Sequence, residues 1–217
     1  MDLKKLTNTN GYIIAYSCAM VIIVAFLLAF VSSALKPMQD DNVKLDKKKQ
    51  ILAALNIRDL DDAASQQMYA KVMKDDKAFD LNSADYKAGN LAVYVCEVDG
   101  QKKYVVPVYG AGLWGPIWGY VAVNADGNTI YGAYFNHEGE TAGLGAEIKD
   151  SKAWQDQFIG KKIYDADGSV ALRVLKASEV TNPESEVDAV TGATLTSNGV
   201  NDMLREGFTK YKKFLQK

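Results

Sequence analysis

The chain has 217 residues, with 25 Lys and Arg against 27 Asp and Glu, which gives a formal net charge of −2 at pH 7. This near balance excludes the strongly basic surface that nucleic-acid binding requires, so we expect no nucleic-acid partner. One His and two Cys, with no cluster at metal-ligand spacing, predict neither a metal site nor a disulfide, and any redox function would therefore need an organic cofactor.

An apolar segment near the N-terminus predicts a membrane-spanning helix. No charged residue lies between Lys5 and Lys36, and residues 12–35 are almost continuously apolar. A helix over this run is about 36 Å long, which is enough to cross a hydrocarbon core of about 30 Å. A cleaved signal peptide with Ser32-Ser33-Ala34 as its cleavage site is the alternative, but the run exceeds the apolar region of about 7–15 residues in such peptides. We therefore expect a single-pass anchor in a lipid bilayer, preceded by a tail of residues 1–11.

The charges that flank this segment do not fix its orientation. Lys4 and Lys5 precede the segment, and Lys36, Lys44 and the lysines at 47–49 follow it. Long domains cross membranes largely regardless of flanking charge. The residue pattern alone therefore leaves open which side of the membrane carries the large C-terminal part.

Residues 36–217 are long enough to form one domain with a core of its own. Apolar residues at helical spacing predict packing helices, so residues 40–80 are expected to be helical. From residue 90 onward the pattern changes to strands rich in β-branched and aromatic residues, with turn residues between them. The predicted elements are helices over 43–56 and 61–74, strands over 91–98, 103–109, 119–124, 129–135 and 170–175, a short helix at 154–158 and a C-terminal helix over about 199–215. The expected fold class is α+β, in which one transmembrane helix precedes an antiparallel sheet with packing helices.

The segment Asp188-Ala-Val-Thr-Gly-Ala-Thr194 is the most informative stretch of the chain. Gly192 can adopt dihedrals closed to other residues and Ala193 adds little bulk, so a large ligand can approach the backbone. The free N–H groups of a following helix would then face a phosphate, with the positive end of the helix dipole behind them. Local physics leaves a second interpretation open, in which Thr196, Ser197 or Asn198 caps the helix and the preceding residues are only its entry turn.

Three motifs carry a resemblance to a known family. The segment Asp188-x-x-Thr191-Gly192-Ala193-Thr194 resembles the acceptor sequence of flavinylated proteins, in which a dedicated flavin transferase joins FMN through its phosphate to the last threonine. The segment His137-Glu-Gly-Glu-Thr-Ala-Gly-Leu-Gly145 resembles the Glu-Thr-Pro-Gly-Leu-Gly signature of the same FMN-binding domain family, with Ala142 in place of the usual proline. The segment Gly110-Ala-Gly-Leu-Trp-Gly-Pro-Ile-Trp-Gly119 narrows the resemblance to the C subunits of the sodium-translocating NADH:quinone oxidoreductase. The G subunits of the Rnf complex share the first two signatures.

The resemblance implies an FMN held as a covalent phosphoester on Thr194, at one edge of the sheet, by loops 110–118, 137–145 and 191–196. Asp188 belongs to the flavinylation motif, as a recognition residue for the transferase or as a turn residue. Lys176 could lie over the phosphate or the reduced ring, or be a surface lysine. For His137, a local hydrogen-bonding role is favoured over proton donation to the flavin. The predicted FMN-binding residues are Leu113, Trp114, Glu140, Thr141, Leu144, Gly145, Lys176, Thr191, Gly192, Ala193, Leu195 and Thr196.

The resemblance also implies a function and a location. The chain is expected to relay single electrons within a membrane complex that couples NADH:quinone oxidoreduction to Na⁺ export, with the other subunits and a flavin transferase as partners. Its domain of residues 36–217, with the FMN-binding part at 90–217, is expected on the periplasmic side of the inner membrane. No Gly-x-Gly-x-x-Gly follows a predicted strand, so no NADH site is expected on this chain. The alternatives are an Rnf G subunit and a non-redox anchored binding module whose Thr194 loop is a helix cap.

Overall fold

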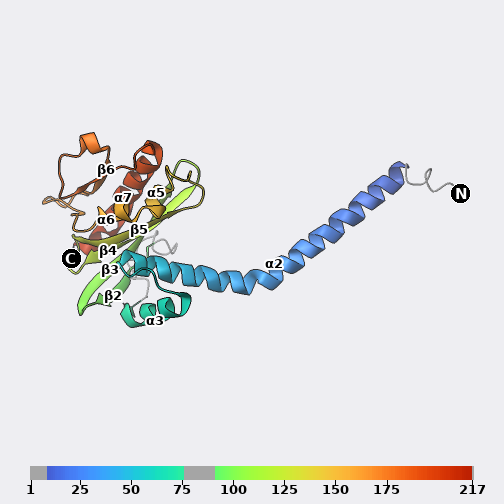
Figure 1. Ribbon diagram of the computed structural model, residues 1–217, viewed down its shortest axis with the longest axis horizontal. Helices are drawn as coiled ribbons and strands as arrows, with labels where there is room; N and C mark the ends of the chain where they lie inside the picture. The colour runs from blue at the N-terminus through green and yellow to red at the C-terminus, as the bar shows by residue number, and fades with distance from the viewer. Residues whose placement is uncertain (1–8, 76–90, 217) are drawn as a thin grey trace. The chain divides into compact units, whose positions relative to one another are not determined.

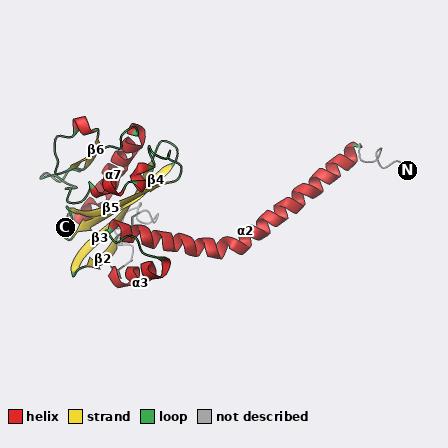
Figure 2. Ribbon diagram, viewed as in Figure 1, coloured by secondary structure: helices red, strands yellow, loops and turns green. Residues whose placement is uncertain are grey.

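The computed structural model describes residues 9–75 and 91–216. The chain divides into two compact units, with the boundary between Asp46 and Lys47. The tail expected at residues 1–11 and the helical region expected at 40–80 each lie partly outside the described residues. Figures 1 and 2 show the elements of both units.

Helix α2 (Asn10–Ala54) begins in the first unit and continues to residue 54 in the second. Its most apolar 18-residue window has a mean hydropathy of 2.7, and the helix is long and apolar enough to cross a membrane. The sequence predicted two separate helices here, over 12–35 and 43–56. The structure instead has one helix with Pro37 inside it.

The end of α2 follows from a left-handed residue that closes the last turn. Asn56 has a φ of 61°, its N–H donates to the Ala53 carbonyl at 3.0 Å, and the Ile57 N–H donates to the Leu52 carbonyl at 2.9 Å. This pair of bonds is a Schellman motif, which satisfies carbonyls that the helix leaves without partners. The chain then turns into α3 (Asp62–Val72), which Asp61 caps by accepting the Ala64 N–H at 2.7 Å.

A five-stranded antiparallel sheet forms the centre of the second unit, with strand order β1-β2-β3-β4-β5. Each strand pairs with the next one along the chain. The alternating pattern predicted β2 to β5, whereas Met73 and Lys74, which belong to β1, were expected at the end of the helix over 61–74. Asp99 and Gly100, at φ values of 51° and 73°, make the tight turn between β2 and β3. The strands are β1 (Met73–Asp75), β2 (Tyr94–Val98), β3 (Gln101–Ala111), β4 (Pro116–Asn124) and β5 (Ile130–His137).

Both faces of the sheet are buried under helices (Figure 1). One apolar cluster joins the sheet to α7 (Thr194–Leu215) and the short helices α5 (Glu147–Asp150) and α6 (Lys152–Asp156). The other cluster joins the opposite face to the end of α2 and to α3. The expected fold class, α+β with an apolar N-terminal helix and an antiparallel sheet covered by packing helices, is thus confirmed.

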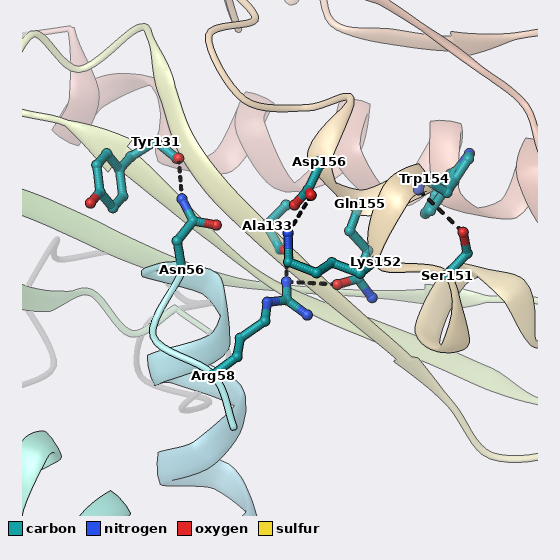
Figure 3. A network of polar contacts seen from close by, with 9 residues as sticks. All are labelled: Asn56, Arg58, Tyr131, Ala133, Ser151, Lys152, Trp154, Gln155 and Asp156. Carbon is teal, nitrogen blue, oxygen red and sulfur yellow. Dashed lines mark hydrogen bonds and ion pairs between the residues drawn. The ribbon is translucent and has the colours of Figure 1, made fainter. Parts of the chain in front are cut away.

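A buried polar network joins the loop after α2 to the sheet and to α6 (Figure 3). Arg58 Nη2 donates to the Ala133 carbonyl at 3.1 Å and to Gln155 Oε1 at 2.8 Å. Gln155 is only 1% exposed, and its Nε2 donates to the carbonyls of Ile148 and Lys149, at the end of α5. Every polar atom of this amide is therefore paired, which is what burial of an amide requires.

Two details of the C-terminal part differ from the prediction. The strand expected at 170–175 is shortened to β6 (Arg173–Leu175), which pairs in parallel with an unpredicted strand, β7 (Glu186–Asp188). A 3₁₀ turn, η1 (Ala177–Glu179), follows β6. Helix α7 begins at Thr194, five residues earlier than the predicted start near Gly199.

Candidate functional site

Thr194 is the first residue of α7, and its side chain is exposed. Ala193 occupies the N-cap position and no side chain caps the helix. The interpretation in which Thr196, Ser197 or Asn198 caps the helix is therefore wrong, because all three lie inside it. The first N–H groups of a helix have no acceptor within the helix, and the positive end of the dipole lies there. Such a terminus, beside the Thr194 hydroxyl, can accept an anion.

The turn that leads into α7 is fixed by its own backbone and by Ser197. The Ala193 N–H donates to the Val190 carbonyl at 3.1 Å, and the Val190 N–H donates to Ser197 Oγ at 3.1 Å. Gly192 takes a φ of 78°, the left-handed region that favours glycine. A Cβ at this position would lie 3.1 Å from Leu144 Cδ2, so the acceptor turn lies directly against the loop that carries Leu144.

The carboxylate of Glu140 joins this helix to a second and a third segment. Oε2 accepts the Thr196 hydroxyl at 2.5 Å, and Oε1 accepts the Trp114 N–H at 2.9 Å. Glu140 is 8% exposed and Thr196 is 2% exposed, so both lie beneath the surface. The structure thus brings together the three predicted loops, although the first of them is shorter than expected, since β3 and β4 extend to leave only residues 112–115 between them.

The site also carries four large apolar side chains that are exposed. A large apolar side chain exposed in solvent stabilises nothing by itself, and several together mark a place where another group binds. The exposed fractions are 48% for Leu113, 69% for Trp114, 43% for Leu144 and 59% for Leu195. They come from the same three segments that Glu140 connects. The arrangement offers apolar and aromatic contacts of the kind that a flat heterocyclic ring needs.

The remaining residues of the Glu-Thr-Ala-Gly-Leu-Gly loop form a tight turn. The Thr141 carbonyl accepts the N–H groups of Leu144 and Ala146 at 3.1 and 3.0 Å. The Thr141 side chain is exposed. His137 Nδ1 accepts the Glu140 N–H at 3.1 Å. The local hydrogen-bonding role favoured for His137 from the sequence is therefore confirmed.

Asp188 and Lys176 lie where the parallel strands end. Leu175 pairs with Asp188 in the β6–β7 register, and the Ala189 N–H donates to the Leu175 carbonyl at 2.6 Å. Lys176 directly follows Leu175 in the chain, so its backbone lies next to the acceptor segment. The side chains of Lys176 and Asp188 are both exposed. The backbone of Asp188 is held on both sides, because its carbonyl accepts Trp154 Nε1 at 2.7 Å and its N–H donates to Gln157 Oε1 at 3.1 Å.

Three residues hold the site in place through contacts that the sequence did not predict. Trp154 and Gln157 hold Asp188 from α6 and the turn after it, and Ser197 closes the acceptor turn. The sequence indicated Trp154 only as an apolar residue of a short helix. Its hydrogen bond could not be predicted, because the indole N–H donates to a carbonyl 34 positions away. Trp118 is partly buried against the second apolar cluster and donates to Gln50 Oε1 at 2.9 Å.

Comparisons with known proteins agree with this geometry. Residues 112–209 match the FMN-binding domain family. The sequence is 33% identical to the C subunit of the Na(+)-translocating NADH-quinone reductase of Haemophilus ducreyi, over 86% of this chain and 85% of that protein. It is 31% identical to the corresponding C subunit of Pseudomonas aeruginosa, over 93% of this chain and 97% of that protein.

A solved structure shows the same fold. The crystal structure of the C subunit of the Na(+)-translocating NADH-quinone reductase from Parabacteroides distasonis superposes with a TM-score of 0.76 and 36% sequence identity, over 84% of this chain and 98% of that chain. The similarity therefore extends well beyond the region of the FMN-binding domain match, 112–209. That region contains the 112–115 loop, Glu140 and the acceptor turn.

Proposed function

Because this chain belongs to the family of C subunits of Na(+)-translocating NADH-quinone reductases, we propose that it carries an FMN joined through its phosphate to the Thr194 hydroxyl. In this proposal the chain relays single electrons between other subunits of the complex. The observation that carries the proposal is the placement of Thr194 at an uncapped helix N-terminus, beside exposed apolar side chains, within an FMN-binding domain.

The residues present fit FMN at both ends of the cofactor. The phosphate would meet the first N–H groups of α7, where the helix dipole favours negative charge. Gly192 gives the acceptor turn a left-handed backbone, at a φ of 78°, that other residues rarely adopt. The ring would lie against Leu113, Trp114 and Leu144, which are exposed and apolar. Thr141, Thr191 and Leu195 are exposed around the same turn and complete the proposed binding surface.

When bound, FMN supplies the one-electron chemistry that no side chain of this chain provides. A link through the phosphate leaves the ring free to be tuned by protein groups, and it prevents loss of the cofactor from a compartment where replacement is difficult. The chain therefore contributes attachment, orientation and partial exclusion of water. The NADH and quinone sites and the export of Na⁺ belong, in this proposal, to the other subunits.

Attachment requires a separate flavin transferase. A threonine hydroxyl is a weak nucleophile unless a base activates it. His137 is the chain's only histidine, and its Nδ1 accepts the Glu140 N–H, so this atom cannot act as that base without breaking the turn. The exposed Asp188 carboxylate, on a backbone held by Trp154 and Gln157, offers the transferase a fixed recognition point. Lys176, beside it, would lie near the phosphate.

We place the FMN-bearing domain outside the cytoplasm. Residues 12–35 would span the inner membrane, with the tail of residues 1–11 in the cytoplasm and residues 36–217 in the periplasm. Cysteine labelling in intact cells tests this topology, in a background where Cys18 and Cys96 are replaced by Ser. A membrane-impermeant thiol reagent should label Glu179→Cys, which lies on an exposed turn, and leave Asn8→Cys unlabelled. The reverse pattern would overturn the topology.

Two alternative functions remain distinguishable by experiment. The relatives described above are C subunits of the sodium complex, which supports that complex over an Rnf G subunit. A non-redox binding module would carry no attached flavin. The chain, co-produced with a flavin transferase and run on a denaturing gel, should show a band with flavin fluorescence. A dark band from the same co-production would favour the binding module.

A further inference from the structure

Both carboxylate oxygens of Glu140 already accept hydrogen bonds from other parts of the protein. Its two oxygens accept the Thr196 hydroxyl at 2.5 Å and the Trp114 N–H at 2.9 Å, and the side chain is 8% exposed. Its own backbone is fixed as well, since the Glu140 N–H donates to His137 Nδ1 at 3.1 Å. A carboxylate in this state is poorly placed to contact a cofactor lying on the surface above it.

Two glycines make room for this carboxylate. A Cβ at Gly112 would collide with Glu140 Oε1, and a Cβ at Gly145 would lie 2.5 Å from both Glu140 Oε2 and Thr196 Oγ1. Neither glycine has a positive φ, so a left-handed backbone is not the reason for glycine at these two positions. The reason is the space that the carboxylate of Glu140 needs. Three segments of the chain therefore converge on one buried carboxyl group.

The bond to Thr196 controls the direction of Thr194. Two residues along an α-helix correspond to a rotation of about 200°, so side chains at these positions point to nearly opposite sides. Thr196 is 2% exposed and faces Glu140, and Thr194 is exposed. Holding the inner side of the first turn thus fixes the direction in which the Thr194 Cα–Cβ bond leaves the helix. The bond to the Trp114 N–H does the same for the loop that carries the exposed indole.

We infer that Glu140 is a positioning residue that acts through Thr196 and the Trp114 backbone, setting the acceptor threonine and the aromatic loop in one fixed relation. The inference rests on the proposed attachment of FMN to Thr194. A hydrogen bond to a charged acceptor is stronger than one between neutral groups, and a buried one is not weakened by competing water. Without it the attached flavin keeps its phosphoester but loses a fixed ring orientation.

The test uses the full chain in detergent micelles, produced with and without a flavin transferase. The variants are Glu140→Ala and Thr196→Val, with Thr196→Ser as the rescue that keeps the hydroxyl. Intact mass measures attachment, and fluorescence anisotropy of the attached flavin measures how freely its ring moves. In the chain without flavin, amide hydrogen exchange of peptides covering residues 112–116 measures protection of the Trp114 N–H.

A matched control separates positioning from general loss of stability. Tyr164→Phe removes another buried hydrogen bond to α7, from Tyr164 Oη to the Phe208 carbonyl at 2.8 Å. Phe208 lies 12 residues beyond Thr196, about 18 Å along the helix axis. This variant should lower the unfolding temperature and leave the flavin anisotropy and the exchange at Trp114 unchanged.

The expected result is a lower flavin anisotropy in Glu140→Ala and Thr196→Val, with wild-type values in Thr196→Ser. Exchange at Trp114 in Glu140→Ala should be at least about tenfold faster, since a hydrogen bond to a charged group contributes at least that factor. Wild-type anisotropy in flavinylated Glu140→Ala and Thr196→Val would overturn the inference. If the Glu140 variant does not fold, the Thr196→Val and Thr196→Ser pair decides alone. A wild-type chain without attached FMN would instead overturn the proposed function, and the exchange at Trp114 would then decide the inference.

Discussion

The side chains of Glu140 and Thr196 lie in direct contact, with 2.5 Å between Oε2 and Oγ1, although 56 positions separate them in the chain. The first belongs to a loop after the last strand of the sheet and the second to the first turn of the C-terminal helix. This contact joins two motifs that the sequence shows only as separate segments. Because the two groups pair with each other, both can be buried.

The glycine at position 145 should not tolerate alanine. A Cβ there would lie 2.5 Å from both atoms of the Glu140–Thr196 bond. Overpacking of a filled site destabilises by about 1 to 3 kcal/mol, so Gly145→Ala should lower the unfolding temperature measured by near-ultraviolet circular dichroism. Gly139→Ala is the control, because the nearest atom to its Cβ would be 3.7 Å away. Equal unfolding temperatures for the two variants would contradict the account.

Replacing Gln155 by Leu should destabilise the fold more than replacing Gln157. Gln155 accepts from Arg58 (Figure 3). It is 1% exposed, and its Nε2 donates to two carbonyls. Its loss leaves buried polar groups without partners, at a cost of about 2 to 4 kcal/mol. Gln157→Leu removes one acceptor from the exposed Asp188 and should cost under about 1 kcal/mol. Thermal unfolding of both variants checks the order, and a reversed order would show that the Arg58 network does not hold α6.

Alkaline solution should weaken the fold through Cys96. Burial raises the pKa of its thiol from 9.0 to about 12, so above pH 9 the unfolded chain loses this proton while the folded chain keeps it. The stability that this group contributes is complete below pH 9 and falls by about 1.4 kcal/mol per pH unit up to about pH 12. Burial raises the pKa of Tyr164 in the same direction. Between pH 8 and 10, wild type should therefore lose about 1.4 kcal/mol more than Cys96→Ala, as measured by denaturant unfolding. Parallel losses in the two proteins would refute this assignment.

The sheet could be predicted from the sequence because its information is local. Alternating β-branched and aromatic residues mark the strands. Asp99-Gly100 is a typical two-residue hairpin turn, because both residues must adopt a positive φ. The start of α7 could not be predicted in this way. The helix was expected to begin near Gly199 because Thr196, Ser197 or Asn198 could cap it, yet these residues lie inside the helix. Gly199 lies inside it as well, at a position where a Cβ would meet the Ala111 carbonyl oxygen of β3. The residue is set by close packing of helix on strand, which no local pattern reveals.

The sequence indicated which residues belong to the candidate site, but not which of them are buried and which are exposed. The motifs named Glu140, Thr196, Leu144 and Trp114 together, and nothing in the sequence separates the buried pair from the exposed pair. That separation depends on contacts between residues 26 and 56 positions apart. Strands β6 and β7 were missed or shortened for a related reason, since three-residue strands show too little periodicity to be recognised.

The central claim is covalent attachment of FMN at Thr194, and the intact mass of the denatured chain tests it most directly. Wild type and Thr194→Ser, each co-produced with a flavin transferase, should gain the mass of one FMN minus one water, because both residues supply a hydroxyl at the start of α7. Thr194→Val, and wild type without the transferase, should show no gain. An unmodified wild-type chain under every condition, or a gain that persists in Thr194→Val, would contradict the account.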